Sequence, residues 1–88
     1  MAKLNWEIVK SNIAEAREQL EEIEKQIRDA EISEGSFEVS IAHTFHHLNF
    51  AWNVRRVSSK RYATCSEADF NSWGAFPSDI ELMKIKTK

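Results

Sequence analysis

The 88-residue chain has few of the residues that cross-link or bend a small protein. Its one cysteine, Cys65, rules out a disulfide within the chain. Two glycines and one proline are too few for the many tight turns of an all-β domain. No stretch reaches the ~18 apolar residues of a membrane-spanning helix, and the first residues contain no apolar run of signal-peptide length. These absences predict a cytoplasmic helical protein with no membrane association.

The chain also lacks a large excess of charge of either sign, because the formal net charge is only −2. The charges are nevertheless unevenly distributed along the chain. Residues 1–34 carry nine acids and five bases, whereas residues 35–62 carry one acid and four bases. The composition therefore implies no partner by itself, and the mixed signs are typical of a globular surface.

The strongest positive feature is an apolar stripe near the start of the chain, with steps of three and four residues. Its members are Trp6, Val9, Ile13, Ala16, Leu20, Ile23, Ile27 and Ala30. A repeat of about 3.5 residues is typical of a helix that keeps one seam against a partner helix. The pattern predicts a helix over about residues 5–31, with Asn5 as its N-cap.

A second helix is predicted over about residues 37–62, after a break at Gly35. Gly35 can adopt a backbone conformation that is closed to other residues, and Ser33 or Ser36 can cap the next helix. A connection this short makes the two helices antiparallel neighbours. The second helix has apolar residues on two sides, so it needs a neighbour on each. One side carries Phe37, Ile41, Phe45, Leu48 and Trp52, and the other carries Val39, Phe50, Val54 and Val57.

We expect the first helix to cover the Phe37–Trp52 stripe. The opposite stripe then requires either the C-terminal tail or a second subunit. An 88-residue domain buries only roughly 60–65% of its unfolded surface, and oligomerisation is a common remedy. The sequence therefore predicts one all-α domain over residues 1–88. Its fold is a long antiparallel helical hairpin with a short helical tail, and two copies form a four-helix bundle.

The tail is predicted to contain a short helix over about residues 66–73, ended by Gly74. Thr64 and Glu67 have the spacing of a capping box. Residues 84–88 are expected to fray. Trp73 and Phe76 either close an open end of the core or form a docking surface for a protein partner.

Three histidines, His43, His46 and His47, lie within a turn and a half of the second helix. Histidines three or four residues apart can hold one metal ion from a single helix face. No spacing identifies a third protein ligand, so packing on a half-buried face is the simpler interpretation. A metal-binding bundle is retained as an alternative.

A basic segment, Arg55, Arg56, Lys60 and Arg61, could contact nucleic-acid phosphates, with Tyr62 available for stacking. Its position near a helix C-terminus gives the cations a structural role as well. Nucleic-acid binding by a helical dimer is therefore a second alternative.

No catalytic constellation or cofactor motif is recognisable. The two glycines are isolated, and no histidine has a glutamate three positions before it. The leading hypothesis is a non-enzymatic interaction or regulatory module without a cofactor. Its partner-binding residues would be Val39, Phe50, Val54, Val57, Trp73 and Phe76.

Overall fold

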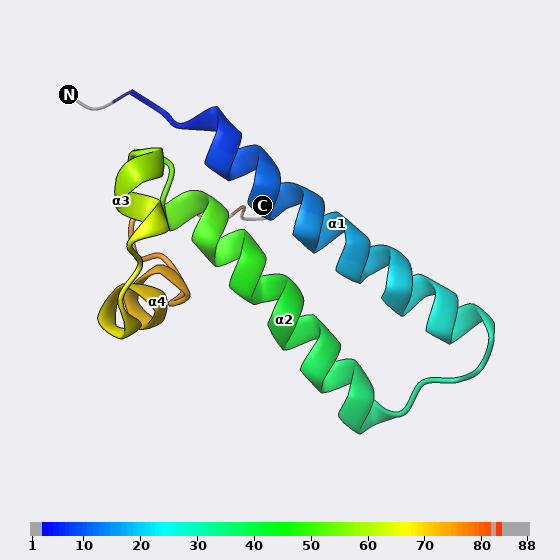
Figure 1. Cartoon of the computed structure of the whole chain (residues 1–88). Coiled ribbons are helices and arrows are strands. Elements are labelled where there is room, and N and C mark those ends of the chain that lie inside the picture. Colours follow the sequence, from blue (N-terminus) through cyan, green and yellow to red (C-terminus); the bar gives the residue numbers. More distant parts are fainter. Residues whose placement is uncertain (1–2, 82, 84–88) are drawn as a thin grey trace, which may run out of the picture.

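The computed structural model describes residues 3–81 and 83, and every regular element in that part of the chain is a helix. Helix α1 (Trp6–Arg28) and helix α2 (Glu34–Asn53) pack side by side as an antiparallel hairpin (Figure 1). Two short helices, α3 (Ser59–Ala63) and α4 (Glu67–Trp73), follow at the open end of the hairpin. The all-α class and the helical hairpin are thus confirmed. The expected fraying of residues 84–88 lies outside the described residues.

Helix α1 begins directly after its N-cap residue, Asn5. The Asn5 side chain accepts a hydrogen bond from the Ile8 amide, and Glu7 lies in the positively polarised first turn. Asn5 also joins α1 to the segment after α2. Its backbone amide donates to the Arg55 carbonyl at 2.6 Å, and its side-chain amide donates to the Val57 carbonyl at 2.9 Å. One residue therefore closes the open end of the hairpin.

The break between the long helices is at Ala30, and the predicted role of Gly35 is wrong. Ala30 has φ = 56°, in the left-handed region, and the Glu31 amide donates to the Gln26 carbonyl. This is the hydrogen bonding of a Schellman C-cap, a position usually occupied by glycine. Gly35 lies instead in the first turn of α2, which is capped by Ser33.

Helix α2 ends at Asn53, nine residues before the predicted end at residue 62. The carbonyls of Arg55 and Val57, which a continued helix would use internally, accept hydrogen bonds from Asn5 instead. Ser58 then caps α3 by accepting from the Arg61 amide. The chain turns here because contacts from a distant segment replace helical hydrogen bonds. Sequence periodicity continues through this turn and does not reveal it.

In the tail, α4 covers the predicted residues, but its cap is Ser66 and not Thr64. Ser66 and Asp69 form a capping box, with each side chain accepting from the other's backbone amide. Gly74 is the C-cap, as predicted. No helix in the described residues is both long enough and apolar enough to cross a bilayer.

Placing glycine at position 30 and alanine at position 35 is expected to stabilise the protein. Ala30→Gly removes a Cβ from a left-handed conformation, a gain of about 1 kcal/mol. Gly35→Ala adds a helix-favouring residue where a new Cβ meets no atom within 4 Å, a gain of about 0.5–1 kcal/mol. Chemical denaturation of the two single variants and the double variant measures both effects. A loss of stability in Ala30→Gly would contradict the left-handed assignment.

Candidate functional site

The seam between α1 and α2 is lined mostly by small or polar side chains. The buried residues of α1 are Ile8, Asn12, Ala16 and Ile23. The buried residues of α2 include Thr44 and Ala51, which share one face of the helix. Small side chains let the two helices approach closely, but they bury little apolar area. Apart from Ile8 and Ile23, most of the larger hydrophobic residues of both helices lie elsewhere.

These larger residues form one exposed surface beside the seam, here called the apolar face. From α1 it contains Trp6, Ile13, Leu20 and Ile27; from α2 it contains Phe37, Phe45 and Leu48. Trp6 is 66% exposed and Ile27 is 56% exposed, although both belong to the predicted seam stripe. Residues of both helices line shared depressions at each end of the hairpin. Both ends of the hairpin therefore carry apolar surface that the two helices share.

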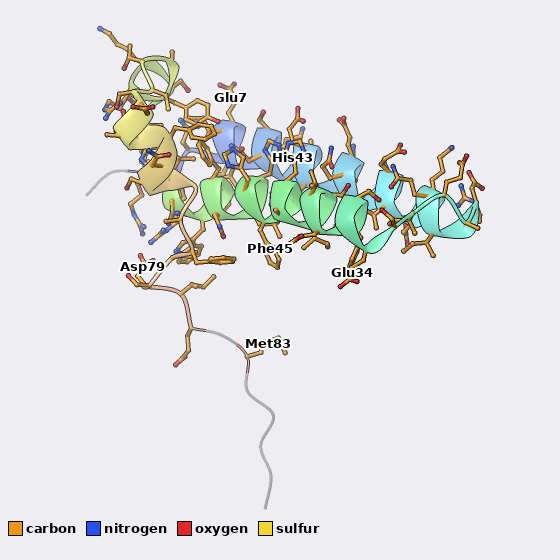
Figure 2. All side chains as sticks on the ribbon, turned by 90° about the horizontal axis from the view of Figure 1, so that it is seen from below. Glu7, Glu34, His43, Phe45, Asp79 and Met83 are labelled. Atoms are coloured by element: carbon orange, nitrogen blue, oxygen red, sulfur yellow. The ribbon has the colours of Figure 1, made fainter. Side chains whose placement is uncertain are left out.

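This arrangement reverses the predicted use of the two stripes of α2. The Phe37–Trp52 stripe is only partly covered, and α1 does not bury it. The opposite stripe is the better covered one, since Phe50 and Val54 form a buried cluster with Ile8 of α1 and pack against residues of the tail. Figure 2 shows Phe45 and His43 pointing to opposite sides of α2. Thus α1 packs between the two stripes, where the small residues are.

An apolar groove of 490 Å³ lies at the open end of the apolar face. Its lining includes Trp6, Ile13, Leu48, Trp52 and Ile80.

A polar bridge fastens the tail beside this groove. The Trp52 indole N–H donates to Asp79 at 2.9 Å, and the Arg55 guanidinium lies 3.8 Å from the centre of the Trp52 ring. Arg55 also pairs with Asp79 at 3.3 Å. The hydrogen bond from Trp52, and then that from Arg55, lowers the pKa of Asp79.

The residues predicted to bind a partner are divided between the core and the surface. Phe50 and Val54 are buried inside the chain, with Val57 and Trp73 packed against them. Val39 and Phe76, in contrast, are each 70% exposed. The tail therefore covers the Phe50–Val57 part of the second stripe in cis, which is one of the two possibilities that the sequence leaves open, and it leaves Val39 exposed. Phe76 packs edge-on against Phe45 and adds to the apolar face.

Side-chain amides of α2 hold the tail in this position. Asn49 donates to the Gly74 carbonyl at 2.9 Å. Asn53 donates to the carbonyls of Trp73 and Ala75, both at 2.8 Å. These bonds satisfy carbonyls at the end of α4, which have no helical partner. The contacts fix the path of the chain after α4.

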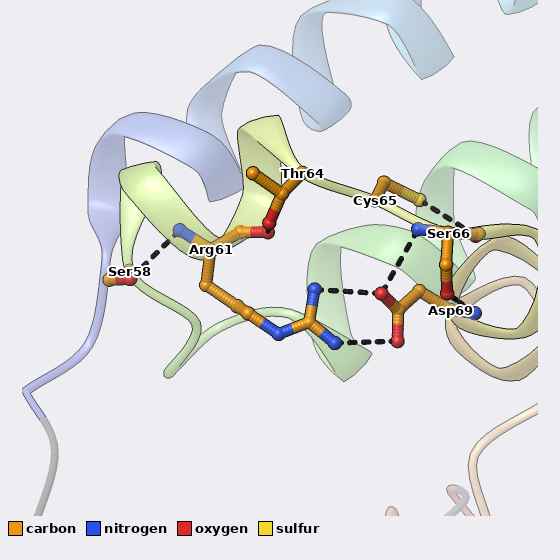
Figure 3. Close-up of polar contacts among 6 residues, drawn as sticks. All are labelled: Ser58, Arg61, Thr64, Cys65, Ser66 and Asp69. Atoms are coloured by element: carbon orange, nitrogen blue, oxygen red, sulfur yellow. Dashed lines mark hydrogen bonds and ion pairs between the residues drawn. The ribbon is translucent and has the colours of Figure 1, made fainter.

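Two of the four cations in the basic segment make ion pairs within the chain. Arg61 makes two parallel contacts of 2.7 Å with the Asp69 carboxylate (Figure 3). The hydrogen bond from Arg61 holds the pKa of Asp69 far below its usual range. Arg55 pairs with Asp79, as described above. Arg56 and Lys60 are exposed, so a nucleic-acid contact would depend chiefly on these two residues.

The three histidines lie in two different environments. The His46 ring packs against two aromatic rings that also contact each other, with centroids 4.4 Å from Phe50 and 4.8 Å from Phe70. Burial, followed by the nearby His47 and His43, lowers the pKa of His46. His43 and His47 instead approach each other, and their Nε2 atoms are 3.0 Å apart. The structure thus separates one packed histidine from a converging pair.

Comparison with known proteins gives no relative. The sequence matches no family model, no curated protein and no solved structure. The function must therefore be argued from the residues of this chain.

Sequence patterns missed Asn12, which links the hairpin seam to the histidines. Asn12 is 4% exposed, and its side chain contacts the Ile8 carbonyl, the Tyr62 hydroxyl and His47. One pattern could have identified Asn12: it is a polar residue four positions after Ile8 and four before Ala16, on a helix face where these two neighbours are apolar. The apolar stripe next to it was stronger and determined the predicted seam.

Proposed function

We propose that this chain is a non-enzymatic association module that works as a homodimer. In the proposed dimer, the apolar faces of two hairpins pack together as a four-helix bundle. The supporting observation is the exposed apolar face, because monomeric proteins rarely expose large contiguous apolar surfaces. Both hairpin helices contribute to this face, and a second antiparallel hairpin is the usual partner for such a surface.

Charge complementarity favours a second copy as the occupant of this face. The turn end of the hairpin, residues 17–38, carries eight acids and three bases. The open end, residues 3–10 and 54–61, carries six bases and one acid. Two of these bases, Arg55 and Arg61, pair with Asp79 and Asp69 of the tail, which leaves Lys3, Lys10, Arg56 and Lys60 for a partner. When two copies pack antiparallel about a two-fold axis, each acidic end lies beside a basic end of the other copy. The same chain thus supplies both the apolar surface and the matching charges.

Two acidic substitutions in the centre of the apolar face should dissociate the dimer. Ile13→Glu combined with Leu20→Glu places four carboxylates in the proposed interface of two copies, where their desolvation is unfavourable. Sedimentation equilibrium should give a dimer for the unmodified chain and a monomer for the variant. Circular dichroism should show that the variant keeps its helices, because both side chains are about half exposed in the single chain.

The matched control is Val39→Glu, which adds a charge on the other side of α2, where the side chain is 70% exposed. It should remain a dimer. A monomeric unmodified chain at tens of micromolar would overturn the proposal and leave the apolar face to a different protein. Equal dissociation by Val39→Glu would also overturn it, because the interface would then not be the apolar face.

A further inference from the structure

The histidine side of the hairpin contains a pair of imidazoles that the association proposal does not use. His43 and His47 are one turn apart on α2, their ring centroids are 4.7 Å apart, and their Nε2 atoms are 3.0 Å apart. Figure 2 shows His43 on the opposite side of α2 from Phe45, which belongs to the apolar face. Packing of two apolar faces would therefore leave this pair accessible.

The orientation of His47 is set from within the core by Asn12. The Asn12 amide donates from Nδ2 to the Ile8 carbonyl at 3.1 Å, and the same nitrogen lies 3.3 Å from the Tyr62 hydroxyl. A carbonyl can only accept, so Oδ1 is the atom that faces His47, where it lies 3.4 Å from Nδ1. His47 therefore donates from Nδ1, and the Nε2 lone pair is directed toward His43.

Asn12 is a buried polar residue of the helix seam, and its side chain has hydrogen-bond partners there. A buried amide in a helix seam is less favourable than an apolar side chain of similar size unless its hydrogen bonds are satisfied. Here those bonds connect the Ile8 turn, Tyr62 and His47. A carbonyl oxygen that accepts from the second ring nitrogen is the usual support of a metal-binding histidine.

We propose that His43 and His47 form a binding site for a divalent transition-metal cation of the type that prefers imidazole, such as Zn²⁺, Ni²⁺ or Cu²⁺. Histidines at positions i and i+4 of a helix can share one ion through their Nε2 atoms. In the metal-free chain His43 Nε2–H donates to His47 Nε2, and the ion would take the place of that proton. With metal–nitrogen bonds of about 2.0–2.1 Å, the 3.0 Å separation corresponds to an angle of about 95° at the metal. Such an angle suits square-planar or octahedral coordination.

The surroundings of the pair also suit a cation. Glu15 of α1 is near enough to act electrostatically on His47, which places a negative charge on this side of the hairpin. Across residues 3–81 and 83, no three histidine, cysteine or carboxylate side chains converge on one point. In the proposed site the two imidazoles are the protein ligands, and water completes the coordination.

The proposal is tested by calorimetric titration of the tag-free full chain with ZnCl₂, NiCl₂ or CuCl₂ at pH 7.5. We expect one ion per chain with at least one of the three salts. His43→Ala and His47→Ala should each weaken binding at least tenfold. The matched control is His46→Phe, which removes the third histidine of the segment and keeps an aromatic ring against Phe50 and Phe70. It should bind within about twofold of the unmodified chain.

A fourth variant, Asn12→Leu, tests the positioning role separately from the ligands. It removes the acceptor of the His47 Nδ1–H and should weaken binding roughly tenfold, the lower end of the usual effect of such partners. Binding that persists in both His43→Ala and His47→Ala would overturn the proposal. The absence of binding with all three salts would also overturn it. His43 is exposed, so His43→Ala is expected to fold, and circular dichroism verifies this.

Discussion

Phe50→Ala is expected to lower the free energy of unfolding by about 3–5 kcal/mol, the usual loss for truncating a buried phenylalanine. Phe50 is 5% exposed and lies at the centre of the cluster that joins the hairpin to the tail. Its ring makes edge contacts with Tyr62, Phe70 and Trp73, at centroid distances of 6.4, 5.6 and 6.0 Å. Removing it creates a cavity beneath both short helices.

Urea denaturation followed by circular dichroism at a fixed protein concentration measures this loss. A decrease of about 3 kcal/mol corresponds to a thermal midpoint at least about 12 °C lower for a domain of this size. The matched control is Phe76→Ala, the same substitution at a side chain that is 70% exposed. It should cost less than about 1 kcal/mol. Equal losses in the two variants would contradict the packing of the tail on Phe50.

Asn5→Ala should produce the second largest loss, about 2–3 kcal/mol. The N-cap hydrogen bond contributes about 1 kcal/mol, and each additional hydrogen bond contributes about 0.5–1.5 kcal/mol. Asn5 caps α1 through Oδ1 and donates from Nδ2 to the Val57 carbonyl and the Ser59 hydroxyl. The substitution therefore removes both the cap and the side-chain link between the start of α1 and the chain after α2.

Asn5→Ser separates these two roles. Serine caps a helix about as well as asparagine, but its short side chain does not reach Val57. Its loss in urea denaturation should be about 1–2 kcal/mol, between those of the unmodified chain and Asn5→Ala. A serine variant as stable as the unmodified chain would show that the link to Val57 contributes nothing. A serine variant as unstable as Asn5→Ala would show that the N-cap hydrogen bond contributes nothing.

Local sequence signals predicted the features that depend on neighbouring residues. Asn5 and Ser33 cap the two long helices, and Gly74 ends α4, all as their residue types indicate. The turn is the exception, because Ala30 adopts the left-handed conformation and Gly35 is helical. Residue preference favours glycine at a C-cap by only about 1 kcal/mol, and the surrounding hydrogen bonds can outweigh that amount.

Which side of each helix faces its neighbour could not be predicted from periodicity. The 3.5-residue repeat of α1 contains both buried residues, such as Ala16 and Ile23, and exposed ones, such as Trp6 and Ile27. Helix α2 has large apolar residues on two sides, and α1 packs between them against Thr44 and Ala51. A repeat identifies an amphipathic helix, but close approach of two backbones is decided by small side chains on both of them.

The helical class, the two long helices and the capping of their starts follow from local sequence, because these features depend on residues within a few positions of one another. The cover of the tail over Phe50 and Val54, and the exposure of the apolar face, arise only when the helices pack together. The same packing brings Asn12 beneath His47, 35 positions along the chain. Such contacts depend on the rotation of one helix about its axis relative to another. That rotation is set by packing across the whole hairpin, and no local pattern encodes it.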